Sequence, residues 1–299
     1  MRAIVAGIGL GMLLAGATAW TQSNPQTQTV AATQPAVATA SPDYSAVYCS
    51  NFVSNDVGKS EPHVISGEES RSRIIFALRD LIFISKGASQ GVRVGDHFSV
   101  IRPEKDPVEV QWFKWQNKLM KAMGTYYRDV GQLTVVNVQP NVATAQITFS
   151  CDYLQRGDIV RPFVERPVPP YKPAEAFDRF APVSGKSVGM IVVGRTFAQE
   201  YGKLSTVYVN LGVNQGVKVG DYLRIFRYQG SKIETAPNFA DSQYEMYGFG
   251  SSPQKFHWND LPRDILGEGI VLNTSSNSST LLITLCRIQA YAGDYVEIE

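Results

Sequence analysis

The sequence contains few of the residues on which catalytic and metal sites depend. Its 299 residues include only three histidines and three cysteines, and neither set has the spacing of metal ligands. The sequence has no Gly-x-Ser-x-Gly motif and no phosphate-binding glycine loop. Charged residues make up 18% of the chain and the net charge is +1, so no long-range field attracts nucleic acid. We therefore expect a protein that is not an enzyme, that needs no cofactor or metal and that does not bind nucleic acid.

The N-terminus has the features of a secretory signal. Met1 and Arg2 are followed by an apolar run through Leu14 and by small residues that end in Ala19, which predicts a signal peptide at residues 1–19. Export then places the protein in the periplasm or on the cell surface. The alternative is an uncleaved signal that anchors the chain in the inner membrane, because the apolar stretch approaches the length of a membrane span.

Two further segments are predicted to lack regular structure. Residues 20–43 are rich in Thr, Gln, Ala and Pro and have no charged residue before Asp43. This composition buries too little apolar surface to offset its chain entropy, so it predicts a disordered tether. Prolines are concentrated at residues 163–185, and because proline fixes φ and donates no hydrogen bond, we expect a semi-rigid linker there. We expect three aromatic residues of this linker to pack it onto a neighbouring domain: Tyr171, Phe177 and Phe180.

The rest of the chain contains an internal repeat. The segment Ile82–Arg102 matches Val207–Arg227 without a gap, 125 positions later, and Gly131–Val160 matches Gly267–Val296 with single-residue gaps. Two matching blocks in the same order indicate a duplication. Each copy has two Gly-Asp pairs, which we expect to form turns because glycine adopts positive φ and aspartate hydrogen bonds to the following backbone. The pairs are Gly95–Asp96, Gly157–Asp158, Gly220–Asp221 and Gly293–Asp294.

Short runs rich in β-branched residues follow one another within each repeat. In the first copy these runs lie at residues 82–84, 98–101, 133–138 and 143–149. Their alternation predicts strands with one buried face, and several short strands of this kind close best as a small barrel or sandwich. The sequence thus predicts a mainly β protein with two tandem units, residues 44–162 and residues 186–299.

The repeated frame resembles a known module. Both copies contain Gly-x3-Gly-Val-x-Val-Gly-Asp, then a strand that ends in Arg102 or Arg227, and finally Gly-Asp before an apolar pair. This frame is similar to the C-terminal β-barrel module of the flagellar assembly protein T family, which also occurs in secreted proteins of Gram-negative bacteria. The resemblance covers most of both repeats. It implies barrels that serve as interaction modules of the cell envelope, with no catalytic residues.

The stretch between residues 108 and 123 combines tryptophan with lysine, and a helix here would place them on separate faces. The apolar stripe would consist of Trp112, Trp115, Leu119 and Met123. The basic face would consist of Lys114, Lys118 and Lys121. Such a helix can bind an anionic membrane or a wall polymer. Alternatively, it caps the mouth of its barrel, with the tryptophans inward and the lysines in water.

These observations favour a non-enzymatic, exported protein that binds an envelope protein, a cell-wall polymer or an anionic membrane surface. The candidate contact residues are Trp112, Lys114, Trp115, Lys118 and Lys121. A second insert, residues 231–262, occupies the matching place in the other repeat and is also rich in aromatic residues. Two alternatives stay open: a cell-wall-modifying hydrolase with a dispersed site, and a membrane-tethered assembly factor for flagella or secretion.

Of the three cysteines, Cys49 and Cys151 are expected to form a disulfide. Export places the chain where disulfides persist, and three cysteines allow at most one internal bridge. Cys151 and Cys286 occupy matching places in the two repeats, and we expect these places to lie too far apart for a bond. Cys49 belongs to a strand-like segment, Ser45–Phe52, which we expect to lead into the first unit. The alternative is three free, buried thiols that pack as small hydrophobic groups.

Overall fold

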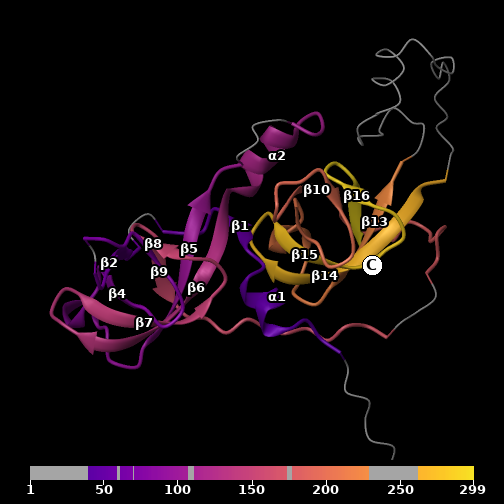
Figure 1. The fold of residues 1–299 in the computed structure, drawn as a ribbon. Helices are drawn as coiled ribbons and strands as arrows, with labels where there is room; N and C mark the ends of the chain where they lie inside the picture. The colour runs from indigo at the N-terminus through magenta and orange to yellow at the C-terminus, as the bar shows by residue number, and fades with distance from the viewer. Residues whose placement is uncertain (1–39, 59–60, 70, 107–110, 174–176, 229–261) are drawn as a thin grey trace, which may run out of the picture. The chain divides into compact units, whose positions relative to one another are not determined.

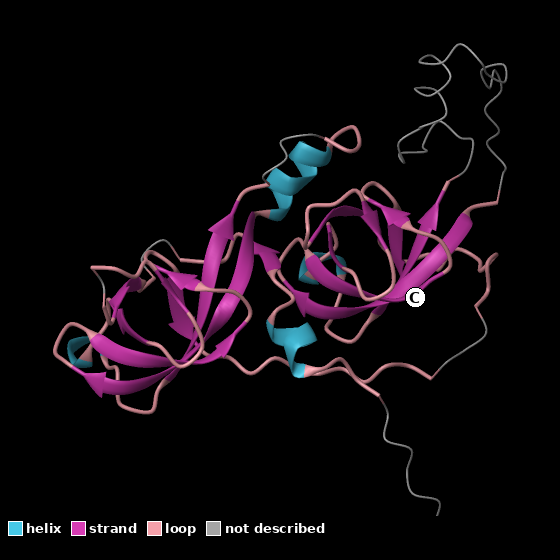
Figure 2. Ribbon diagram, in the orientation of Figure 1, coloured by secondary structure: helices cyan, strands magenta, loops and turns pink. Residues whose placement is uncertain are grey.

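A computed structural model describes residues 40–58, 61–69, 71–106, 111–173, 177–228 and 262–299. As predicted, the chain is mainly β, with two sheet regions and only short helices (Figures 1 and 2). The predicted signal peptide, nearly all of the predicted tether and nearly all of the second insert lie outside the described residues. No helix within the described ranges is both long enough and apolar enough to span a membrane.

The first sheet, here called the N-terminal sheet, contains the predicted strands of the first repeat. Its strands are β1 (Phe52–Ser54), β2 (Val64–Gly67), β4 (Leu81–Ile84), β5 (His97–Glu104), β6 (Thr125–Val138), β7 (Ala143–Ser150) and β9 (Ile159–Pro162). They pair in the order β2-β4-β7-β6-β5-β9, and β1 pairs with β6 beside this path. A separate pair consists of β3 (Ile75–Phe76) and β8 (Leu154–Gln155). Alternate residues face the core, for example Ile82 and Ile84 of β4, which are fully buried.

The second sheet, the C-terminal barrel, is a closed antiparallel barrel of six strands. Its strands are β10 (Val188–Gly194), β12 (Thr206–Val209), β13 (Tyr222–Arg227), β14 (Asp264–Thr274), β15 (Ser279–Cys286) and β17 (Tyr295–Ile298). They pair in the order β10-β12-β15-β14-β13-β17, and β17 returns to β10. The separate pair here is β11 (Glu200–Tyr201) with β16 (Ala290–Tyr291). The strand order therefore matches that of the N-terminal sheet, strand for strand.

The two sheets differ at the point of closure. In the barrel, Gly189 pairs with Val296 and Met190 pairs with Tyr295. At the matching place in the described part of the N-terminal sheet, β9 and the residues before β2 are joined by a single β-bridge, between Ile159 and His63. Pro62 precedes this bridge and accepts a hydrogen bond from Val160 N (2.7 Å). Because proline has no N–H to return to the ladder, the pairing stops there.

The Gly-Asp pairs form turns, but the aspartates bond in the opposite direction from the one expected. Gly95 and Gly220 both have φ of +92°, where a side chain would be strained. Asp96 accepts a hydrogen bond from Arg93 N (2.9 Å), three residues before it, and the other three aspartates follow the same pattern. Each carboxylate therefore closes the turn that precedes it.

Two of these aspartates also hold the arginines that end the repeated strands. Asp158 accepts two hydrogen bonds from Arg102 (2.7 and 2.9 Å), and Asp294 accepts two from Arg227 (both 2.7 Å). Both carboxylates are buried. Burial lowers the pKa of Arg102, but its hydrogen bond and ion pair with Asp158 more than offset this, so the pKa lies above its ordinary value. The repeated arginine and the second Gly-Asp turn thus form one unit in each sheet.

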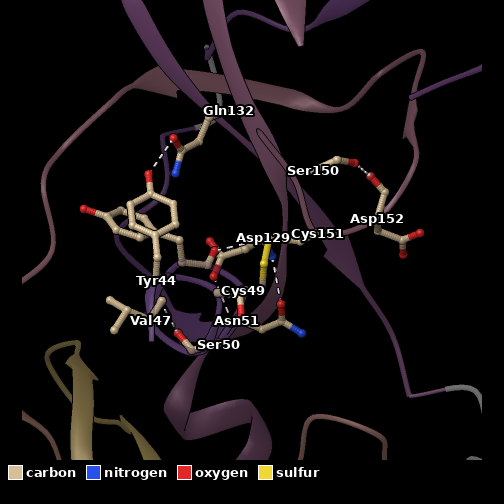
Figure 3. The surroundings of a disulfide bond; sticks show 12 residues. Tyr44, Val47, Cys49, Ser50, Asn51, Asp129, Gln132, Ser150, Cys151 and Asp152 are labelled. Carbon is tan, nitrogen blue, oxygen red and sulfur yellow. Dashed lines mark hydrogen bonds between the residues drawn. A yellow bond between two sulfur atoms is a disulfide. The ribbon is translucent and has the colours of Figure 1, made fainter. Parts of the chain in front are cut away.

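The segment that carries Cys49 begins as a helix and not, as expected, as a strand. α1 spans Tyr44–Tyr48, and the Asp43 side chain caps it by accepting a hydrogen bond from Ala46 N (2.6 Å). The predicted disulfide between Cys49 and Cys151 is present, with a Cα–Cα distance of 5.5 Å (Figure 3). Cys286 is free. Strand structure starts only after the disulfide, at β1.

The residues around the disulfide fix this segment to both sheets. Asp129 of β6 accepts a hydrogen bond from Asn51 N (2.8 Å) and forms an ion pair with Arg166 of the linker (2.6 Å). On the barrel side, three side-chain hydroxyls donate to main-chain carbonyls of the segment. They are Tyr208 to Ser50 (2.8 Å), Thr280 to Asn51 (3.0 Å) and Ser278 to Val53 (2.6 Å). The predicted units are consequently joined within one compact region, Thr39–Glu299.

The described residues of the proline-rich linker contain no strand, and two of the three aromatic residues expected to pack on a domain contact the barrel. Tyr171 contacts the cluster around Ile270, and Phe177 contacts the cluster around Phe226. Phe180 is exposed, so the expectation that it packs on a domain is wrong. The two residues after it are held by hydrogen bonds, because Arg263 donates to the carbonyls of Ala181 and Pro182.

Candidate functional site

The candidate surface lies on the insert between β5 and β6, of which residues 105–106 and 111–124 are described. Its helix, α2, spans Gln116–Met123. Phe113, just before the helix, is buried in the core cluster of the C-terminal barrel, where a Cβ on Gly293 would lie 3.0 Å from its ring. Met123 is buried with Val192 and Tyr208 of the barrel. The insert thus begins in one sheet and is anchored in the core of the other.

A buried glutamine completes this anchor. The Gln116 side chain accepts a hydrogen bond from Trp112 N (2.7 Å) and donates one to the carbonyl of Val192 in β10 (2.8 Å). Both polar ends of the amide are therefore satisfied, as a buried side chain requires. Because Gln116 links the start of the helix to a barrel strand, the orientation of α2 is fixed.

The predicted apolar stripe is wrong at one of its four residues, Trp115. Trp115 does not face inward: it caps the helix, is 60% exposed and has φ of +82°. Trp112 lies outside the helix and is half-buried against the barrel core. Leu119 and Met123 pack on the barrel as the predicted stripe requires, and the buried residues that precede them are Phe113 and Gln116. The chain is helical only from residue 116, so helical spacing does not hold at Trp115 and its side chain lies on the exposed side.

The lysines are exposed as predicted, and the exposed tryptophan joins them. We call this set the basic-aromatic surface; it consists of Lys114, Trp115, Lys118 and Lys121. The Lys114 ammonium lies 4.9 Å from the centre of the Trp115 ring, and that of Lys118 lies 6.0 Å from it. Such cation–π contacts are worth about 0.5–1 kcal/mol at an exposed site. They hold the two charges beside an apolar ring.

Sequence reasoning missed the anchor residues Phe113 and Gln116. A signal for them was present, because Phe113, Gln116, Met120 and Met123 also recur at helical spacing. A polar residue at the second of these positions made the pattern look interrupted. Only the main-chain carbonyl of Val192, which belongs to the other repeat, explains why a glutamine is buried there.

A second feature is a cleft of about 630 Å³ next to the disulfide. Its charged lining includes Arg128, which forms ion pairs with Glu104 and Asp152 (both 2.5 Å). Burial lowers the pKa of Arg128, and the two carboxylates raise it by more, so the guanidinium stays charged. The arginine and both carboxylates are thereby occupied with one another.

Among the described residues, one serine and one histidine lie within hydrogen-bond distance of each other. Ser85 Oγ lies 3.2 Å from His63 Nδ1, but the same oxygen accepts a hydrogen bond from His63 N (2.9 Å). No carboxylate in the described ranges bonds to His63 to orient it, as a catalytic triad needs. The described part of the chain also contains no group of three residues that could hold a metal ion.

No protein-family model matches the sequence, and a search of curated proteins found no match either.

Proposed function

We propose that this protein is a non-enzymatic component of the cell envelope that binds an anionic lipid surface through the basic-aromatic surface. The observation that carries the proposal is the exposure of three lysines and a tryptophan on an insert whose opposite side is fixed in a barrel core. An exported location is part of the proposal. It has limited support from the Cys49–Cys151 disulfide, since such bonds persist in oxidising compartments.

The residue types suit a membrane surface. Lysine near an anionic bilayer contributes about 1 kcal/mol of binding free energy, and tryptophan favours the boundary between headgroups and hydrocarbon. The overall charge of +1 supplies no general attraction, so binding has to arise from this local cluster. Because the insert is already ordered by Phe113 and Gln116, little conformational entropy is lost when it binds.

We further infer that the two sheets arose by duplication of one module, which is similar to the barrel of the flagellar assembly protein T family. The shared strand order, the repeated Arg-Asp pairs and the matching Gly-Asp turns support this inference. A module of this kind supplies a rigid support for inserts. The insert between the fifth and sixth strands of the first copy then carries the binding role.

Neutralising the three lysines tests the proposal. The variant Lys114→Gln/Lys118→Gln/Lys121→Gln is expected to lower the partition coefficient onto phosphatidylglycerol vesicles about 100-fold, because three contributions of about 1 kcal/mol are lost. Vesicle co-sedimentation at low ionic strength measures this, and added salt should weaken binding of the parent protein.

The matched control removes three charges elsewhere. Arg93, Lys203 and Lys218 are exposed and lie outside the insert, so their replacement by glutamine is expected to leave vesicle binding nearly unchanged. Equal losses in both triple variants would contradict the proposal, as would unchanged binding in the first. Retention by isolated cell-wall sacculi with no binding to vesicles would assign the surface to a wall polymer instead.

Trp115 offers an independent test because its backbone is strained. A non-glycine residue at φ of +82° is unfavourable, so Trp115→Gly is expected to change the free energy of unfolding by less than about 1 kcal/mol. Vesicle affinity should fall roughly tenfold, since the aromatic contact with the bilayer is lost. Thermal unfolding and vesicle titration measure the two effects, and Trp115→Tyr should retain most of the affinity. A large loss of stability in Trp115→Gly would mean that the ring is structural.

A further inference from the structure

The cleft beside the disulfide has one wall from each sheet. The wall from the N-terminal sheet includes Glu104, Arg128 and Asp152, which form ion pairs with one another and carry one positive charge against two negative charges. The wall from the barrel is formed by the two loops that flank β11, residues 195–199 and 202–205. A cleft of about 630 Å³ between two modules has the size and the place of a small-molecule site.

The N-terminal sheet has the same pair of loops around β3, so the two backbones can be compared. Asp80 closes its turn by accepting a hydrogen bond from the main-chain N–H three residues before it (2.8 Å), and Ser205 closes the matching turn in the same way (3.1 Å). The residues just before them, Arg79 and Leu204, both have positive φ, +76° and +67°. The turns thus share a backbone, although their side chains differ.

The first difference between the side chains is one of charge. In the N-terminal sheet, Asp80 also forms an ion pair with Arg73 of the preceding loop. In the barrel, Ser205 takes the place of this carboxylate and closes the turn without a charge. The arginine of the barrel loop, Arg195, is exposed and forms no ion pair within the part of the chain that the structure describes. A cation without a counterion therefore lines the barrel wall of the cleft.

The second difference is an apolar side chain on the same wall. Leu204 takes the place of Arg79, lines the cleft and is 67% exposed. Its positive φ is one that leucine rarely adopts, so neither burial nor backbone preference favours leucine here. The buried ring of Phe197 lines the cleft as well. The barrel wall therefore presents one positive charge together with apolar side chains.

We propose that this cleft binds a carboxylate that carries an apolar side chain, with Arg195 as its counterion and Leu204 against its apolar group. Free apolar amino acids and the apolar C-terminus of a peptide share this chemistry. Arginine suits the role because its guanidinium pairs with a carboxylate through two parallel hydrogen bonds. Phosphate suits the cleft less, because Glu104 and Asp152 on the opposite wall disfavour a second negative charge. The site is separate from the basic-aromatic surface.

NMR titration of the full chain with N-acetyl-leucine tests the proposal. A ligand of this size should bind with a dissociation constant of about 1 mM, and N-acetyl-leucinamide, which lacks the carboxylate, should bind at least about tenfold more weakly. Arg195→Gln should weaken the binding of N-acetyl-leucine to a similar extent. The matched control, Arg79→Gln, changes an exposed arginine in the corresponding loop of the other sheet and should bind like the parent. No saturable binding by the parent, or equal binding by the parent and Arg195→Gln, would overturn the proposal.

A second variant tests the apolar contact without weakening the turn. Asparagine tolerates positive φ better than leucine, so Leu204→Asn should unfold at the same temperature as the parent or slightly above it, while its affinity for N-acetyl-leucine falls roughly fivefold. Unchanged affinity would contradict the assigned contact. Tighter binding of free leucine than of N-acetyl-leucine would assign the site to amino acids, and the reverse order to a peptide C-terminus. The triple lysine variant should bind N-acetyl-leucine like the parent, which keeps this test independent of vesicle binding.

Discussion

Replacing Phe113 by alanine is expected to lower the free energy of unfolding by about 3–5 kcal/mol, the usual loss for a buried phenylalanine. The residue lies in an insert of the N-terminal sheet, where truncation would ordinarily have little effect. Its ring, however, belongs to the core cluster of the C-terminal barrel and is in contact with the Gly293 turn. Removing it leaves a cavity that the closed barrel cannot readily collapse to fill. Thermal unfolding should show a decrease in Tm of roughly 10 °C.

The neighbouring residue supplies the control for this prediction. Lys114 is exposed, so Lys114→Ala should change the free energy of unfolding by less than about 0.5 kcal/mol. Phe113→Leu, which retains part of the apolar volume, should fall between the parent and Phe113→Ala. If Phe113→Ala and Lys114→Ala had equal stability, the insert would not be anchored in the barrel core.

Removing the disulfide is expected to have an effect of similar size. The bond joins residues 102 positions apart, and in the chain-entropy model a loop of this length contributes about 4–5 kcal/mol to stability. The double variant Cys49→Ala/Cys151→Ala should therefore unfold at a markedly lower denaturant concentration than the parent. Chemical denaturation monitored by tyrosine and tryptophan fluorescence measures the difference.

The free cysteine provides the matched comparison. Cys286 is partly buried and lies at the place in the barrel that corresponds to Cys151. Burial raises the pKa of its thiol, so it is a weak nucleophile, and Cys286→Ala should cost much less than loss of the bond. Peptide mapping without reductant should recover Cys49 linked to Cys151. Three alkylated thiols, or a link from Cys151 to Cys286, would show that the assignment is wrong.

The strands and their turns could be predicted from the sequence because their causes are local. Alternation in Leu81–Ile84 and Ala143–Ser150 requires one buried face whatever the partner strand is. Gly95 and Gly220 adopt positive φ because the turns require it. The disulfide was also accessible, since export and the repeat left Cys49 and Cys151 as the favoured pair.

The closure of each sheet and the packing of the insert on the barrel depended on contacts between residues far apart in the chain. A proline at the place of Gly189 limits the N-terminal sheet to a single bridge, which matters only once the strand order is known. The inward faces of the insert were decided by Phe113 and Gln116, whose partners lie in the other repeat. Local periodicity cannot locate a core that another segment of the chain supplies, because burial is a property of the assembled fold. The sequence by itself therefore determined the strands, the turns and the basic side of the insert. Only the tertiary structure decided that Trp115 is exposed and that the insert of the N-terminal sheet is anchored in the core of the C-terminal barrel.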